Sequence, residues 1–149
     1  MEDFVFYNDL KDFDSNDYQL IKRAQEATQL AYAPYSNFFV GAALLLLDGS
    51  IVAGANQENV SYPLCMCAER VALYNLSIQH PAKQIHKMAV VARKEEEFVP
   101  ATCCGACRQV MLEFEKRQKC SYEIIMLGAD KKWIKCRSAS VLIPFQFEF

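Results

Sequence analysis

Two short segments of the sequence combine residue types that can hold a metal ion and move protons. They read C-A-E-R at 67–70 and C-G-A-C-R at 104–108. Each stands at the expected start of a helix, where unpaired backbone N–H groups and the helix dipole favour a thiolate over a thiol. Cys104 and Cys107 are three residues apart, so their sulfurs project on one side of a first helical turn. Two converging helix starts would therefore present three thiolates, those of Cys67, Cys104 and Cys107, to one ion.

Three sulfur ligands indicate zinc with an open coordination position. Soft sulfur donors in a tetrahedral arrangement favour zinc over other common metals. Structural zinc sites close with four protein ligands, whereas catalytic sites keep three and leave a place for water. Cys65 and Cys103 could in principle add a fourth sulfur, but each is too near a proposed ligand in the chain to chelate the same ion readily. We therefore expect one zinc ion per chain in an open, catalytic site.

Glu69 follows Cys67 by two residues and is placed to act on a metal-bound water. Zinc lowers the pKa of such a water to about 7, and a nearby carboxylate can accept its proton and pass it on. Alone, Glu69 would be interpreted as an acid stabilised by a helix N-terminus. Three thiolates leave the metal site with a net negative charge, which a cation near the sulfurs would offset. Arg70 is the first candidate for this role and Arg108 the second, although each could instead be an exposed helix arginine.

The elements that must position these segments follow from apolar periodicity and turn residues. Residues 15–33 predict a helix ended by Pro34. Residues 38–47 and 51–55 predict two strands joined by a hairpin turn at Asp48-Gly49. The other expected elements are helices at 66–78 and 105–116, strands at 87–93, 122–127 and 133–136, and a short helical turn before Pro144. This order predicts a three-layer α/β/α sandwich with a mixed five-stranded sheet.

Length and charge favour one compact domain that acts on a small molecule. The chain has 149 residues, enough for one core, and no linker or repeat divides it. Residues 1–14 are expected to be an irregular acidic extension, and residues 15–149 a single domain. The formal net charge is -2 and no Lys/Arg-rich run occurs. A nucleic-acid polymer is therefore disfavoured as a partner, since binding one requires cations that neutralise phosphates.

Neither a signal peptide nor a membrane span is expected. The N-terminus is acidic and lacks a basic start followed by an apolar run. The longest apolar run, residues 40–47, is far shorter than the roughly 20 residues that cross a bilayer. We therefore expect a cytoplasmic protein, in which the seven cysteines are thiols, metal ligands or catalytic groups and not disulfides.

In these motifs the chain resembles the small, homotetrameric, zinc-dependent cytidine deaminases, within the cytidine and deoxycytidylate deaminase superfamily. The resemblance covers nearly the whole chain, and Cys67 in place of histidine is similar to the branch that acts on free nucleosides. It implies hydrolytic deamination of cytidine or deoxycytidine to uridine or deoxyuridine plus ammonia, as in pyrimidine salvage. Zinc-bound hydroxide would be the nucleophile and Glu69 the proton carrier.

Two further segments, residues 33–44 and 56–63, resemble the family's first strand and its sugar-binding loop. By this resemblance Asn56 and Glu58 would bind the ribose 3′-hydroxyl, and Phe38 would pack on the base. Aromatic rings suit a flat base, and a polar pair left unpaired by a wrong ligand would reject it. Asn56 could instead shape a turn, and Phe38 could belong to the core.

The remaining implied contacts involve other subunits or the backbone. The backbone of Ala68, together with Glu69, would bind the polar edge of the pyrimidine. Tyr62, and Phe147 in a C-terminal I-P-F-Q-F that resembles the family's ending, would reach a neighbouring subunit's site. The resemblance thus implies a homotetramer with shared active sites, although Phe147 could also be a core residue.

Departures from the family pattern and three other functions complete the interpretation. Cys103 stands where the family usually has proline before C-x-x-C, and Phe39 where proline is common. One alternative is a deaminase of a modified or blasticidin-like nucleoside. A second is a non-catalytic, zinc-stabilised interaction module, which would place four protein sulfurs on the metal. A third is a redox protein that uses Cys104 and Cys107 as a thiol pair.

Overall fold

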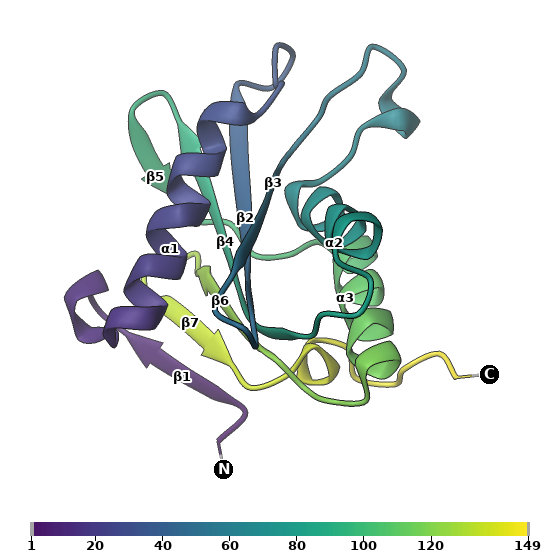
Figure 1. Cartoon of the computed structure of the whole chain (residues 1–149). Coiled ribbons are helices and arrows are strands. Elements are labelled where there is room, and N and C mark those ends of the chain that lie inside the picture. The colour runs from purple at the N-terminus through teal and green to yellow at the C-terminus, as the bar shows by residue number, and fades with distance from the viewer. Residues whose placement is uncertain (1, 149) are drawn as a thin grey trace.

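The computed structural model describes residues 2–148 and shows one sheet with helices on both faces (Figure 1). The strand order is β1-β7-β6-β4-β2-β3, and β5 pairs with β4. The strands are β1 (Phe4–Tyr7), β2 (Phe38–Leu46), β3 (Ile51–Ala55), β4 (Ile85–Lys94), β5 (Glu97–Val99), β6 (Glu123–Leu127) and β7 (Trp133–Cys136). Within residues 2–148, β4 and β6 form the one parallel pair of strands, so the sheet is mixed, as predicted.

Helix α1 (Ser15–Ala27) covers one face of the sheet, and α2 (Ala68–Gln79) and α3 (Gly105–Gln118) lie side by side on the other (Figure 1). The core is divided in the same way. Leu20 and Ile21 of α1 pack with Val91 and Ile125 of the sheet, while the second cluster contains the buried residues of α2 and α3. The predicted three-layer α/β/α sandwich is confirmed. None of the helices in the described part is long and apolar enough to cross a membrane.

The sheet has seven strands, two more than the five expected. The segment 1–14 was expected to be irregular, but residues 4–7 form β1, which pairs antiparallel with β7. Phe13 then packs edge-on against Trp133, with 6.1 Å between ring centroids. Strand β5 lies between the strand expected at 87–93 and the helix expected at 105–116, where no element was expected. Both extra strands are short and mostly exposed. Strand β1 depends on the distant β7, whereas β5 pairs antiparallel with β4 directly before it, with Glu97 opposite Lys94.

Helix α1 ends earlier than expected, at Ala27, and a 3₁₀ turn at Thr28–Leu30 follows. The chain then becomes extended because Tyr32 pairs with the segment after β3. Its N–H donates to the carbonyl of Asn56 at 3.0 Å, and its carbonyl accepts from the N–H of Glu58 at 2.8 Å. These bonds tie the end of α1 to two residues predicted to bind substrate.

Gly54 of β3 sets how closely α2 approaches the sheet. A Cβ at this position would meet the backbone N of Ala72 at 2.4 Å and the carbonyl O of Ala68 at 2.8 Å. Both contacts are with backbone atoms, which cannot rotate away. The glycine therefore allows the first turn of α2, directly after Cys67, to lie against β3.

We expect Gly54→Ala to destabilise the protein by about 1–3 kcal/mol, the usual cost of overpacking a core. Gly105→Ala is the matched control, because a Cβ at Gly105 meets nothing within 4 Å. Urea unfolding of both variants measures the difference in the free energy of unfolding. Equal stabilities for the two variants would contradict this account of the contact between α2 and β3.

Candidate metal centre and active site

The starts of α2 and α3 carry the three predicted thiols. Cys67 is the N-cap of α2, and Cys104 is the N-cap of α3. The sulfur of Cys104 accepts a hydrogen bond from the N–H of Cys107 at 3.4 Å, so Cys107 lies in the first turn directly beside it. The Sγ atoms of all three residues lie within 4.8 Å of one another. The two helix starts therefore converge.

This sulfur cluster fits a zinc ion by the chemistry of its donors. It is the one group of three or more Cys, His, Asp or Glu ligand atoms at this spacing within residues 2–148. The sulfur of Cys65 lies instead by the backbone of Asn59, at 3.2 Å from its N and 3.5 Å from its O. Cys103 is buried beside the carboxyl group of Glu69. Three soft donors without a fourth are typical of a catalytic zinc site.

Hydrogen bonding among the thiols favours a thiolate at Cys67. A bond from the thiol of Cys107 lowers the pKa of Cys67 to about 5, against the effect of burial, and Arg70 adds to the shift. The same bond and burial raise the pKa of Cys107, which keeps its proton. The guanidinium Nη2 of Arg70 donates to the sulfur of Cys67 at 3.5 Å, and this bond raises the pKa of Arg70. Arg70 is thus where a cation that offsets thiolate charge is needed.

Glu69 is the carboxylate nearest to this cluster in the chain, and it is 5 % exposed. Burial, followed by the charge of Cys67, raises the pKa of Glu69. A carboxyl group with a raised pKa gives and takes a proton closer to neutral pH than an exposed one does. Its environment therefore suits acid–base chemistry.

A cavity of about 290 Å³ is lined by two residues of the sulfur cluster, by the acid of the first cysteine segment and by the predicted sugar and base contacts. Its walls include Phe38, Asn56, Glu58, Cys67, Glu69 and Cys104. Pockets for small organic ligands measure about 300–1,000 Å³, so the cavity is near the lower end of that range. Five residues predicted from the two motifs and the sugar-binding loop thus line the same cavity as Phe38; they are Asn56, Glu58, Cys67, Glu69 and Cys104.

Two of these residues are fixed by backbone contacts. The amide of Asn56 donates from Nδ2 to the carbonyl of Phe38 and accepts at Oδ1 from the N–H of Val40, both at 2.8 Å. This side chain continues the pairing between β2 and the end of β3, so Asn56 does shape the backbone there. The carboxylate of Glu58 accepts from the hydroxyl of Ser36, which lowers the pKa of Glu58.

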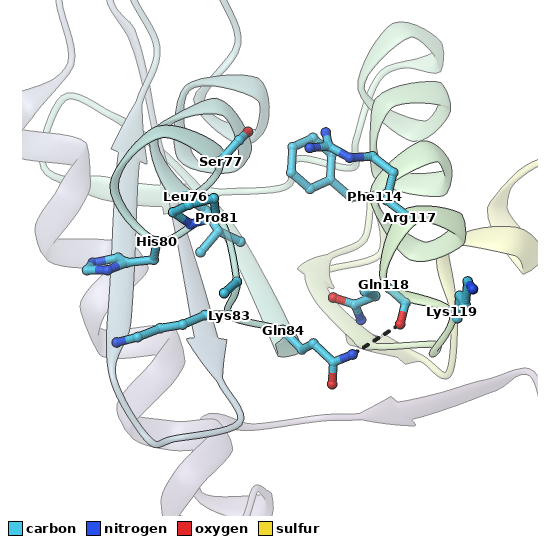
Figure 2. Close-up of a pocket in the computed structure, with 11 residues that line it drawn as sticks. Leu76, Ser77, His80, Pro81, Lys83, Gln84, Phe114, Arg117, Gln118 and Lys119 are labelled. Atoms are coloured by element: carbon cyan, nitrogen blue, oxygen red, sulfur yellow. Dashed lines mark hydrogen bonds between the residues drawn. The ribbon is translucent and has the colours of Figure 1, made fainter.

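A second cavity, of about 400 Å³, lies at the opposite ends of α2 and α3 (Figure 2). Gln84 donates to the carbonyl of Gln118 across it at 3.1 Å. His80 and Lys83 extend away from α3 in this view, whereas the guanidinium of Arg117 lies over the ring of Phe114 at 4.5 Å. The described residues that line it include no thiol or carboxylate, so this cavity lacks the chemistry of the first.

Comparison with known proteins agrees with this geometry. The family described as the cytidine and deoxycytidylate deaminase zinc-binding region matches residues 14–130. The chain belongs to this deaminase family. The cytidine deaminase of Halalkalibacterium halodurans is 51% identical over 94 residues, which are 63% of this chain and 68% of that protein. The probable cytidine deaminase of Dictyostelium discoideum is 38% identical over 127 residues, 85% of this chain and 80% of that protein.

Solved structures give the same result for the deaminase fold. The crystal structure of cytidine deaminase from Burkholderia pseudomallei has a TM-score of 0.73 and 40% identity, and the match covers 87% of this chain and 98% of that one. Cytidine deaminase from Mycobacterium tuberculosis has a TM-score of 0.70 and 32% identity, and the match covers 91% and 100% of the two chains. The fold predicted from the sequence is thus that of cytidine deaminases.

Six predicted site residues of this deaminase-family chain lie outside the lining of the cavity. Two of them, Cys107 and Arg70, belong to the sulfur cluster described above. Ala68 is fully buried in the first turn of α2. Tyr62 is 73 % exposed in a 3₁₀ turn, and Phe147 is 71 % exposed near the C-terminus. Arg108 donates from Nε to the carbonyl of Cys103 at 2.8 Å and from Nη1 to that of Leu142 at 3.5 Å. Its hydrogen bonds within residues 2–148 therefore go to backbone oxygens, unlike the predicted contact with a sulfur.

Thr102 and Ser36, at or next to this cavity, were not singled out from the sequence. Thr102 lines the cavity beside the second cysteine segment. Ser36 hydrogen-bonds to Glu58, 22 residues away in the chain. Proximity to a metal motif could have suggested Thr102, whereas nothing in the local sequence indicates which carboxylate a loop serine will meet.

Proposed function

We propose that the protein removes the amino group of cytidine or deoxycytidine by hydrolysis and releases uridine or deoxyuridine and ammonia. Three thiol sulfurs lie together, and two of them, those of Cys67 and Cys104, line one small cavity with the buried carboxyl group of Glu69; this arrangement carries the proposal. The names of the relatives support it, since they are cytidine deaminases. A carboxylate on the cavity wall, Glu58, disfavours a substrate with a phosphate nearby, which supports a free nucleoside over a nucleic-acid polymer.

We propose that Cys67, Cys104 and Cys107 hold one zinc ion per chain. When bound, zinc acidifies a coordinated water so that it becomes a nucleophile near neutral pH. Cys107 must lose its proton for the metal to bind, so zinc affinity will fall as the pH falls. Arg70, already hydrogen-bonded to the sulfur of Cys67, offsets the negative charge that three thiolates bring to the site.

Glu69 acts as the general base and then the general acid in this proposal. Its carboxylate accepts a proton from water, whose oxygen forms a bond to C4 of the cytosine ring. Glu69 delivers this proton to ring nitrogen N3. It then takes the remaining proton from the hydroxyl now on C4 and gives it to the amino group, as the C4–N bond breaks and the C4 carbonyl forms. The ring of Phe38 packs on the base, Glu58 and Asn56 hold the sugar 3′-hydroxyl, and the backbone N–H at Ala68 faces the polar edge of the pyrimidine. Both sugars carry a 3′-hydroxyl, so these contacts serve either substrate.

We further propose that the protein acts as a homotetramer in which Tyr62 and Phe147 contribute to neighbouring sites. Two observations support this role: the exposure of Tyr62 (73 %) and Phe147 (71 %) in the single chain, and the family resemblance. Aromatic residues are enriched in the buried centres of protein–protein interfaces. Light scattering of the purified protein gives the mass and thereby the number of subunits.

Zinc content and cytidine turnover, measured on one purified sample, test the proposed function. We expect one zinc per chain and equal amounts of ammonia and uridine. The reaction is monitored by the change in ultraviolet absorbance when the base loses its amino group. Zinc without turnover of any nucleoside would favour the interaction module, and chelator-insensitive disulfide reduction would favour the redox protein. Turnover confined to a modified nucleoside in a substrate panel would identify the alternative deaminase.

A further inference from the structure

Glu58 is held by the loop before β2 through three hydrogen bonds. Its Oε2 accepts from the backbone N–H of Tyr35 at 2.9 Å and from that of Ser36 at 3.3 Å. Its Oε1 accepts from the hydroxyl of Ser36. Glu58 is only partly buried, and these three bonds to the loop fix the direction of its carboxylate.

The direction of the Ser36 hydroxyl is fixed as well. Its oxygen accepts from the N–H of Phe38 at 3.1 Å, so the single hydroxyl hydrogen is left for Glu58. Asn37 between them has a φ of 53°, a left-handed conformation that Asn tolerates better than most residues. This local turn brings the N–H of Phe38 back to Ser36. Ser36 thus connects the proposed sugar contact to the start of the strand that carries the proposed base contact.

The hydrogen-bond capacity of Glu58 limits what it can bind. A carboxylate offers about four acceptor positions, and three are occupied by the loop. The remaining position is on Oε1, the same oxygen that accepts from Ser36. Glu58 lines the cavity, so this position can accept one hydrogen bond from a ligand hydroxyl. A hydroxyl can donate there, whereas a phosphate oxygen has no proton to give.

We propose that Ser36 is a positioning residue that aims the carboxylate of Glu58 at the sugar 3′-hydroxyl of the substrate. The inference rests on the proposed function, because it assigns Ser36 to the nucleoside site of that reaction. Ser36 does not touch the reacting atoms, so its loss weakens substrate binding and leaves the chemical step nearly unchanged. Loss of the 3′-hydroxyl from the substrate makes Ser36 dispensable.

The test compares Ser36→Ala and Ser36→Thr with cytidine and 3′-deoxycytidine as substrates. Loss of one hydrogen bond to a charged group corresponds to about a tenfold effect, so we expect KM for cytidine to rise about tenfold in Ser36→Ala. We expect kcat to change less than about threefold, since the lost bond acts equally in the ground and transition states. Ser36→Thr keeps a hydroxyl and should restore KM. With 3′-deoxycytidine, Ser36→Ala and the unmodified protein should have the same KM.

Ser50, in the turn between β2 and β3, provides a matched control. Its hydroxyl donates to Asp48 at 2.5 Å and its N–H donates to the same carboxylate at 3.0 Å, which repeats the arrangement at Ser36 away from the cavity. Ser50→Ala should leave KM, zinc content and melting temperature unchanged, and Ser36→Ala should also keep its zinc. An unchanged KM for cytidine in Ser36→Ala, or an equal rise for both substrates, would overturn the proposal for Ser36. Failure of the proposed function would differ, since the unmodified protein itself would then turn over neither nucleoside, and both proposals would fall.

Discussion

Replacing Glu69 with Gln is expected to lower kcat for cytidine by about 10²–10⁴-fold, the usual contribution of general acid–base catalysis. The amide can neither accept the proton of water nor return it to the leaving amine. Gln has almost the same shape as Glu, and the side chain is 5 % exposed, so the substitution should fit the site. Zinc content should stay near one per chain because Glu69 is not a proposed ligand.

Ammonia release, zinc content and melting temperature of the Glu69→Gln variant are the measurements needed. Glu113→Gln is the matched control, because Glu113 is an exposed residue of α3 outside the active-site cavity. It should retain full turnover. Turnover by Glu69→Gln within about tenfold of the unmodified protein would exclude the proton-carrier role, since such a loss is below the range for a catalytic acid–base group.

The site was predictable because its chemistry is encoded locally. Cys67 and Cys104 are each followed by a helical pattern, and a cysteine at a helix start requires no knowledge of the fold to identify. The spacing between Cys104 and Cys107 fixes two sulfurs on one turn. What the spacing alone could not supply is the convergence of the two helices. That depends on Gly54, where the absence of a side chain lets α2 lie against β3.

The features that were missed depend on contacts between distant segments. Asp17, only 1 % exposed, bonds to Lys87 at 2.6 Å and to Lys135 at 2.8 Å, from 70 and 118 residues away. Its spacing from Leu20 and Ala24 is that of the buried face of α1, but nothing in the local sequence indicates which lysines will pair with it. Strand β1 likewise depends on the free edge of β7. Arg108 was the second candidate, after Arg70, for a cation near the sulfurs, but its guanidinium donates to the carbonyls of Cys103 and Leu142.

Cys107→Ser is expected to remove zinc and turnover together. The thiol of Cys107 is fully buried within the cluster, and a serine hydroxyl is a harder donor that does not ionise at neutral pH. Changes to groups that only orient a ligand weaken metal affinity about 10–100-fold, so loss of the ligand itself should weaken it by more than about 100-fold. Cys120→Ser is the control, because Cys120 is exposed and outside the cluster, and it should keep both zinc and activity.

Thermal unfolding separates a metal that is held by the folded site from one that binds loosely. A ligand present at 1,000 times its dissociation constant stabilises the native state by about 4 kcal/mol, so chelation should lower the melting temperature of the unmodified protein. Adding zinc back should restore both melting temperature and turnover. Cys107→Ser should already melt at the lower temperature and should not respond to the same zinc concentration. Two results would show that these three sulfurs do not form the metal site: a Cys107→Ser variant that keeps one zinc per chain, or an unmodified protein whose melting temperature does not change on chelation. The acid–base role of Glu69 would then lack the activated water on which it acts.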